Sequence, residues 1–268
     1  MEKLARFGRV FGSVALFCAA SFAVAQAPLP AAATAQSASS WVAIPGNIFA
    51  SLEKGKPSGI FIEALDAVLK KSGVTPTYLN MPTGDALRDL NSGTISVATV
   101  VVPTPRIKDA AYFSAPVVNE YNVVVTLKGK GFDLAKVSDL HGKKIGARVG
   151  YQYPLLEKDQ DIQLLRYPTD GEMLRALLFG QVDVAIIAGI SDIYALRSEG
   201  IIMRLEILKT SVGVVPLVAA FSKKSFTRES VDAFDQALVS FKQGPEWQAI
   251  LERNGMSDLV KDWPLVTE

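Results

Sequence analysis

A run of apolar, mostly β-branched residues from Val97 to Val102 gives the clearest strand signal in the chain, and it ends at Pro103 and Pro105. A run of this length, preceded by a helix-ending glycine and followed by a proline-rich turn, is typical of a buried strand in a parallel sheet. Ligands of open α/β sheets bind beyond the carboxyl ends of the strands. The first cation after the run, Arg106, is therefore a candidate ligand-binding residue.

The same helix–glycine–strand pattern occurs twice, at residues 86–98 and 173–185. Leucine, arginine, leucine, glycine, valine and alanine recur at equivalent positions in the two segments. This duplicated unit predicts two similar α/β lobes with a cleft between them.

The rest of the folded chain alternates between the period of a strand and that of a helix. We expect Thr169 to open the second repeat helix with a capping box that ends at Glu172, and Ser191 to cap the helix after it. The fold class that follows is α/β, with parallel or mixed sheets covered by helices. Strands are predicted at 41–44, 75–79, 123–127 and 212–221, a strand and turn at 144–150, and further helices near 61–69, 191–199, 231–241 and 247–251.

The first 25 residues have the pattern of a cleaved secretory signal peptide. Three basic residues precede an apolar run at 10–24, and Ala-Val-Ala at 23–25 offers a cleavage site. The alternative is that this segment is not cleaved and anchors the protein in the membrane. Residues 26–40, rich in Ala, Pro, Ser and Gln, are expected to be a disordered leader. The only cysteine, Cys18, lies within the signal, so the mature protein has no disulfide, Cys-ligated zinc or cysteine nucleophile.

Charge and side-chain chemistry exclude several function classes. A formal net charge of +1 gives no electrostatic reason to expect nucleic acid as a partner. The single histidine, His141, cannot by itself build a multi-histidine metal site or a Ser–His pair, and no Gly-rich phosphate loop is present. We therefore expect no metal and no cofactor. Arg106 either binds a carboxylate or phosphate with its planar guanidinium or pairs with a nearby acid such as Asp109.

Five segments, in order, resemble the bacterial family 3 extracellular solute-binding proteins, the periplasmic polar amino-acid receptors of ABC importers. The resemblance runs from about residue 41 to the end of the chain. The segments are Gly-Ile-Phe-Ile-Glu-Ala-Leu at 59–65, Thr-Pro-Arg through Tyr-Phe-Ser-Ala-Pro at 104–116, Ser-Asp-Leu-His-Gly-Lys-Lys-Ile-Gly at 138–146, Gly-Gln-Val-Asp-Val at 180–184, and Gly-Pro-Glu-Trp-Gln-Ala-Ile-Leu at 244–251.

The resemblance implies a type II periplasmic-binding-protein fold with a ligand cleft between two lobes. Lobe 1 would hold residues 41–122 and 217–268 and lobe 2 residues 123–216, with hinges near 121–125 and 212–217. It also implies a monomer in the periplasm that closes over a small amino acid or organic anion and delivers it to an ABC permease.

Several site residues are carried over from the resemblance. Arg106 would bind the α-carboxylate of the ligand, helped by backbone N–H groups at Tyr151 and Gln152, where a helix is expected to start. A cation at the position of Arg148 faces the ligand in some relatives. Phe49 is the one candidate for the aromatic residue that covers the ligand.

Three positions depart from the family pattern. Ala188 stands where amino-acid binders usually carry the Asp that pairs with the ligand's ammonium, Val101 replaces a Thr, and Thr83 replaces a Trp. An ammonium without a partner in a closed cleft would lose hydration worth several kcal/mol. A small organic anion is therefore expected in place of a standard α-amino acid, unless Glu120 or another acid replaces the missing Asp.

Two alternatives stay open beside a transport receptor without enzymatic activity. Family 3 includes periplasmic cyclohexadienyl dehydratases, which use a carboxylate in the cleft as a general acid, and such a group cannot be identified from sequence. The second alternative is a protein whose cleft no longer binds a solute and which docks a partner, for example as the periplasmic subunit of a membrane sensor. Fold-level analogy cannot decide among these functions.

Overall fold

The computed structural model describes residues 40–268. The predicted signal peptide and all but the last residue of the predicted leader lie outside this range. The strands are β1 (Ser40–Ile44), β2 (Ser51–Glu53), β3 (Lys56–Ser58), β4 (Pro76–Asn80), β5 (Val97–Val101), β6 (Ala111–Phe113), β7 (Val118–Leu127), β8 (Ile145–Arg148), β9 (Leu164–Tyr167), β10 (Val184–Ala188) and β11 (Leu205–Ser222). The helices are α1 (Ile60–Lys71), α2 (Thr83–Ser92), α3 (Pro154–Glu157), α4 (Asp170–Leu178), α5 (Ser191–Ser198), α6 (Arg228–Lys242) and α7 (Pro245–Arg253), with 3-10 turns η1 (Pro105–Ile107), η2 (Val137–Leu140) and η3 (Ile201–Arg204).

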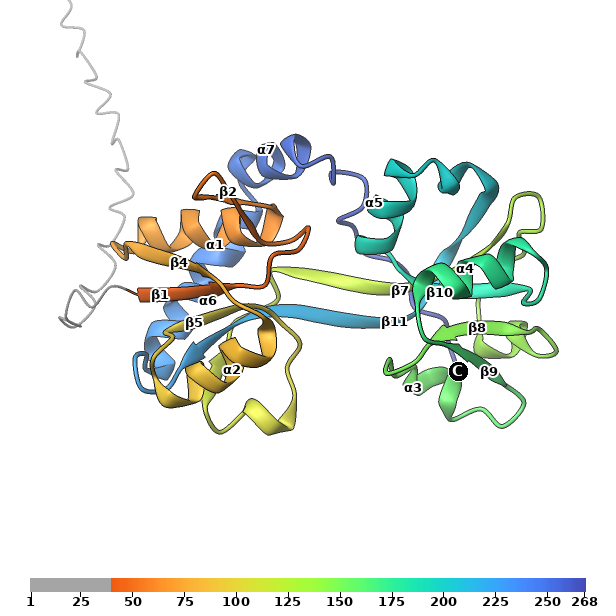
Figure 1. Cartoon of the computed structure of the whole chain (residues 1–268), viewed down its shortest axis with the longest axis horizontal. Coiled ribbons are helices and arrows are strands. Elements are labelled where there is room, and N and C mark those ends of the chain that lie inside the picture. Colours follow the sequence, from red (N-terminus) through yellow and green to blue (C-terminus); the bar gives the residue numbers. More distant parts are fainter. Residues whose placement is uncertain (1–39) are drawn as a thin grey trace, which may run out of the picture. The chain divides into compact units, whose positions relative to one another are not determined.

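Nine strands form one mixed sheet in the order β4-β1-β5-β11-β7-β10-β8-β9, with β6 also paired to β11 (Figure 1). The pairs β1–β4 and β1–β5 are parallel, as are β8–β9 and β8–β10. These two parallel sets are the sheets of lobe 1 and lobe 2. The α/β class and the two-lobed arrangement predicted from the sequence are confirmed.

The two parallel sets are connected through β7 and β11, which pair antiparallel with each other over most of their length. In Figure 1 the two strands run side by side from one set to the other. The predicted hinge segments at 121–125 and 212–217 lie within these continuous strands. The ladder between them shifts register twice, between Ile207 and Ser211 and between Ser211 and Gly213.

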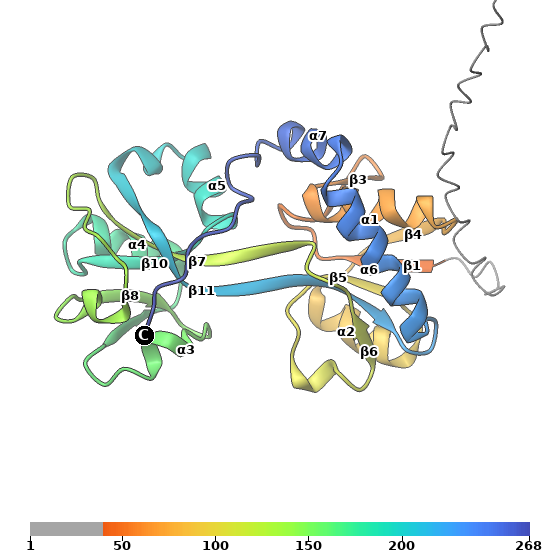
Figure 2. The same ribbon diagram turned by 180° about the vertical axis from the view of Figure 1, so that it is seen from behind.

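Alternate residues of the lobe 1 strands enter different hydrophobic clusters, as expected for strands covered on both faces. Val42, Ile44 and Val97 pack in the cluster that holds α1, α6 and α7. Ala43 and Ala98 pack in the cluster that holds Ala86 and Leu90 of α2. Figure 2 shows α1, α6 and α7 together from behind.

Both copies of the repeat form the predicted helix, turn and strand. Gly93 after α2 and Gly180 after α4 have φ angles of +84° and +70°, which glycine adopts without the steric cost of a side chain. The strands β5 and β10 follow, and each places its carboxyl end at the edge of its parallel set. No helix within residues 40–268 has the length and apolar character needed to cross a bilayer.

Helix starts are fixed by several kinds of contact. Thr169 caps α4 as predicted, accepting a hydrogen bond from the Glu172 N–H at 3.2 Å, but among the described residues the Glu172 side chain does not return the bond that would complete the predicted capping box. The prediction that Ser191 caps α5 is wrong: the N-cap is Ile190, and no side chain of the helix itself closes this end. Instead, the carboxylate of Glu120 on β7 accepts hydrogen bonds from the backbone N–H groups of Ile190 and Ser191.

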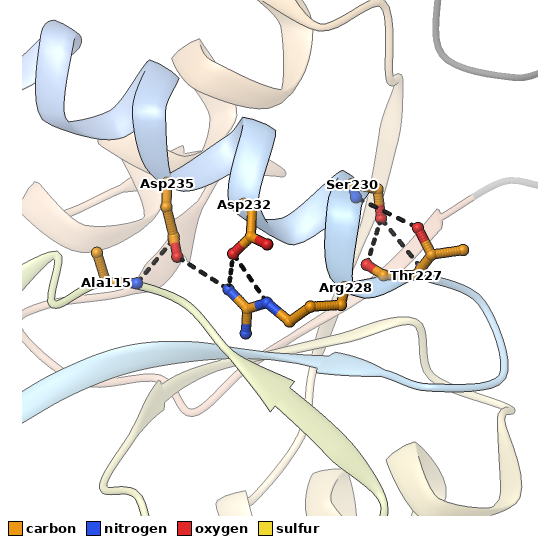
Figure 3. A network of polar contacts seen from close by, with 6 residues as sticks. All are labelled: Ala115, Thr227, Arg228, Ser230, Asp232 and Asp235. Carbon is orange, nitrogen blue, oxygen red and sulfur yellow. Dashed lines mark hydrogen bonds and ion pairs between the residues drawn. The ribbon is translucent and has the colours of Figure 1, made fainter.

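The start of α6 anchors the segment between β6 and β7 (Figure 3). Thr227 and Ser230 exchange capping hydrogen bonds, and Arg228 pairs with Asp232 and lies 3.5 Å from Asp235. Asp235 in turn accepts a hydrogen bond of 2.7 Å from the backbone N–H of Ala115.

Candidate functional site

The carboxyl ends of β8 and β10 lie beside a small cavity in lobe 2. Arg148 ends β8, Ala188 ends β10, and Ala188 pairs with Asn122 of β7. The cavity has a volume of about 10 Å³ and is lined by Asn122, Arg148, Tyr151, Tyr153, Asp170, Ile186, Ile187, Ala188 and Asp192. The structure therefore brings together Arg148, Tyr151 and Ala188 at the sheet edge where α/β proteins bind ligands.

Arg148 is engaged by the protein itself. Its Nε lies 3.0 Å from Asp170 Oδ1, and Nη1 donates a hydrogen bond to the Pro168 carbonyl. The Nε–H is buried and is not aligned for a hydrogen bond with any described residue. Its guanidinium carbon lies 5.9 Å from the centre of the Tyr151 ring. The positive charge of Arg148 is therefore largely balanced by Asp170.

Asp192 places a carboxylate beside Ala188. It lies in the first turn of α5, four residues beyond Ala188, and its Oδ2 accepts a hydrogen bond of 2.8 Å from the Ala188 N–H. Burial raises the pKa of Asp192 from 3.8 to about 6, and the nearby Asp170 charge acts in the same direction. The Ala188 hydrogen bond and Arg148 oppose this shift but do not cancel it.

Glu120 lies outside the cavity, at the start of α5. Its side chain is 7% exposed, and its carboxylate faces the start of α5 through the two N–H groups it accepts from. Burial raises its pKa from 4.5 to about 7, although the backbone hydrogen bonds favour the ionised form. Glu120 is not among the residues that line the cavity.

Tyr151 and Gln152 precede a helix but do not start it. Both side chains are exposed, Tyr153 is the N-cap, and α3 begins at Pro154 with a single turn. The backbone carbonyl of Tyr151 accepts a hydrogen bond of 2.7 Å from Arg166. A four-residue helix has little macrodipole, so this turn offers a weaker anion site than the resemblance implies.

The lobe 1 residues proposed from the sequence lie apart from this cluster. Arg106 is exposed in η1, beyond β5, and forms no ion pair with any residue of 40–268, including Asp109. Thr83 is the first residue of α2 and is half-buried. Val101 is 1% exposed and Phe49 is 5% exposed, so both side chains belong to the core.

The carboxyl end of β5 has an unusual backbone. Val100 has a φ of +55°, a conformation that is rare for a β-branched residue because its side chain clashes with the backbone. Directly opposite, the ladder between β5 and β11 shifts register between Val218 and Ala220. Such strain persists only where surrounding structure enforces it, and it concentrates near functional sites.

A larger cavity of about 400 Å³ lies at the other end of the β7–β10 ladder, near Thr126, Lys130 and Val184. Its wall also includes His141, whose Nε2 lies 2.9 Å from Asp159 Oδ2. His141, Asp159 and Asp161 lie close enough to offer three metal ligands, but His141 and Asp161 are exposed and His141 already pairs with Asp159. None of these residues belongs to the strand edge that holds Arg148 and Ala188.

Sequence reasoning missed Asn122, Asp170 and Asp192. Asp170 falls within the predicted capping box at 169–172, and no role was predicted for Asn122 or Asp192. Spacing gives a signal for Asp192, because a residue in the first turn of a helix after a strand can fold back on the strand end. The pairing of Asp170 with Arg148 joins the start of α4 to the end of β8, 22 residues apart in the chain, and has no local signal.

Comparison with known proteins adds to these observations. Residues 44–256 match the model of the bacterial extracellular solute-binding proteins, family 3. A probable amino-acid-binding protein of Bacillus subtilis (strain 168), YxeM, is 26% identical over 162 residues, which cover 59% of this chain and 61% of that protein. The match thus spans about three fifths of the relative's length.

Two solved structures share the fold. The second substrate-binding domain of a putative amino acid ABC transporter from Streptococcus pneumoniae Canada MDR_19A has a TM-score of 0.66 at 18% identity, over 81% of this chain and 99% of the other. An ABC uptake transporter substrate-binding protein from Streptococcus pneumoniae with bound histidine has a TM-score of 0.57 at 20% identity, over 84% and 95%. Because the family model matches most of the chain, this protein belongs to family 3 of the bacterial extracellular solute-binding proteins.

Proposed function

We propose that this protein is a periplasmic receptor that captures an amino acid and delivers it to the permease of an ABC importer. The observation that carries the proposal is the polar cluster at the carboxyl ends of β8 and β10, where Arg148, Asp170 and Asp192 surround Ala188. Such a cluster offers donors and acceptors for a small zwitterion. The relatives support it, since their descriptions concern amino-acid binding and ABC transporters.

Arg106 is the proposed anchor for the ligand's carboxylate. It is exposed and has no ion-pair partner within residues 40–268, so its guanidinium is available for a bidentate contact. It follows β5, whose carboxyl end carries the strained Val100. Lobe closure on β7 and β11 would bring this cation to a ligand held at the lobe 2 edge.

We also propose that the protein does no chemistry on its ligand. The general acid of a dehydratase would need to face the cleft with a free proton. Glu120, whose pKa of about 7 suits acid catalysis, has its carboxylate turned to the start of α5. This arrangement favours a structural role for Glu120.

A thermal-shift screen of the refolded, ligand-free mature protein tests the proposal. The panel contains the amino acids, matched keto acids, dicarboxylates and amines. Binding to the folded state alone raises the melting temperature, by an amount that grows with ligand concentration. We expect at least one amino acid to raise it and to be recovered unchanged. No shift with any amino acid, or conversion of a bound one, would overturn the proposal.

A further inference from the structure

We propose that Asp192 holds the ammonium group of the ligand, in the place of the Asp that is absent at position 188. This inference rests on the proposed function and deepens it, because it assigns the cation-binding group and the ligand class. The carboxylate comes from the first turn of α5 and reaches back to the end of β10, so its position differs from a carboxylate carried by the strand itself.

The cavity beside Asp192 has the size of an ammonium group. Its volume of about 10 Å³ is close to the smallest space that holds one water molecule. A primary ammonium is of similar size and donates three hydrogen bonds. A planar guanidinium needs more room. The space therefore favours a primary ammonium.

The cavity also offers an unused acceptor. Oδ2 of Asp192 receives the Ala188 N–H, whereas Oδ1 has no hydrogen bond with any residue in the described range 40–268. Asn122, which is 6% exposed, lines the cavity together with Asp192. A bound ammonium would donate a charge-assisted hydrogen bond to the free Oδ1 of Asp192.

The balance of charge favours a cation over an anion here. Asp170 already pairs with Arg148, at 3.0 Å. Ionised Asp192 is then the charge left without an opposite partner around the cavity. An ammonium would pair with it, whereas a second carboxylate would be repelled. The organic anion expected from the sequence does not suit this half of the site.

Glu120, the acid that the sequence offered as a replacement, is already in use. Its two carboxylate oxygens accept the N–H groups of Ile190 and Ser191. Moving it into the cavity would leave the first N–H groups of α5 without partners. The structure assigns Glu120 to the helix and leaves Asp192 for the ligand.

The test compares two ligands on two variants by calorimetry. The ligands are the amino acid that gives the largest thermal shift and its deaminated carboxylic acid. The variants are Asp192→Asn and, as a matched control, Asp133→Asn, which removes the same charge from an exposed loop of lobe 2. Asn at 192 can still accept the Ala188 N–H, so the fold is preserved, and an unchanged melting temperature verifies this.

For the amino acid we expect Asp192→Asn to weaken binding at least thirtyfold, to about the affinity of the deaminated acid, as for loss of a charge-assisted pair. Affinity for the deaminated acid should stay the same or rise, and Asp133→Asn should change neither. Equal effects on both ligands, or no effect on the amino acid, would overturn the role of Asp192 while leaving the proposed function intact. No amino-acid binding by the unaltered protein would overturn both.

Discussion

Arg106 in lobe 1 and Arg148 in lobe 2 lie at similar places in their lobes but have different surroundings. Each lies beyond or at the carboxyl end of a strand in a parallel set. Arg106 is exposed and has no ion pair within residues 40–268. Arg148 has a 21% exposed side chain, pairs with Asp170 and donates to the Pro168 carbonyl.

The comparison shows that a cation at a strand end does not by itself make an anion site. Whether such a cation can bind an anion depends on the other charges around it. At the lobe 1 edge the charge of Arg106 is free to bind a carboxylate. At the lobe 2 edge the pair Arg148–Asp170 is neutral, and Asp192 adds a negative charge. This difference underlies our proposal that the two edges together bind a zwitterion.

Substitution of Arg106 is expected to have the largest effect. Arg106→Ala should weaken amino-acid binding by about 3 to 4 kcal/mol, more than a hundredfold, because a desolvated charge pair is lost. The melting temperature without ligand should stay the same, since the side chain is exposed. Calorimetry measures the affinity. Lys108→Ala, an exposed cation in the same turn, is the matched control, and a loss equal to that of Arg106→Ala would refute a specific anchor.

Removal of the buried Glu120 carboxylate should change how stability depends on pH. Its folded pKa of about 7 lies above its ordinary value of 4.5, so the folded state binds more protons between these values. Its contribution to stability is therefore full below about pH 4.5 and is lost as pH rises through 7, by about 3 kcal/mol. Asp192 contributes to the pH dependence of stability in the same direction, because its pKa is raised from 3.8 to about 6.

Denaturant unfolding at several pH values measures this dependence. In Glu120→Gln the fall in unfolding free energy should end near pH 7, about one unit above the Asp192 pKa of about 6, whereas in the unaltered protein it should continue to about pH 8. The variant should therefore exceed the unaltered protein in stability at pH 8. Gln keeps an oxygen acceptor for the Ile190 N–H. Glu252→Gln on the exposed face of α7 should leave the profile as it is. A profile for Glu120→Gln that still falls between about pH 7 and pH 8 would show that another group is responsible.

A smaller effect is expected at the strained end of β5. Val100→Gly should change the unfolding free energy by less than about 1 kcal/mol, because release of the left-handed strain offsets the lost packing. The same change at the neighbouring Val101, which is 1% exposed and has no positive φ, should cost about 3 kcal/mol. Equal losses at the two positions would show that Val100 is not strained.

The sequence predicted the framework because its signals are local. The repeats with Gly93 and Gly180 set helix ends and strand starts, and the apolar run at 97–101 became β5. The helix at 191–199 was predicted correctly but its cap was not, since the first N–H groups of α5 are satisfied by Glu120, 70 residues earlier in the chain.

The candidate site was only partly predictable for the same reason. Arg148 and Ala188 could be found from motif positions, but the charge of the site depends on Asp170 and Asp192. The contact of Asp170 with Arg148 joins the start of α4 to the end of β8, and no periodicity encodes it. Phe49, expected over the ligand, is needed by the core, where its carbonyl accepts the N–H of Phe61 at 2.9 Å.

The most direct test of a zwitterion site is a calorimetric titration of the unaltered protein with three matched ligands. These are the amino acid with the largest thermal shift, its deaminated acid and its decarboxylated amine. If lobe 1 binds the carboxylate and lobe 2 the ammonium, each truncated ligand should bind at least thirtyfold more weakly than the amino acid, a loss of about 2 kcal/mol or more. A deaminated acid that binds as tightly as the amino acid would contradict the account.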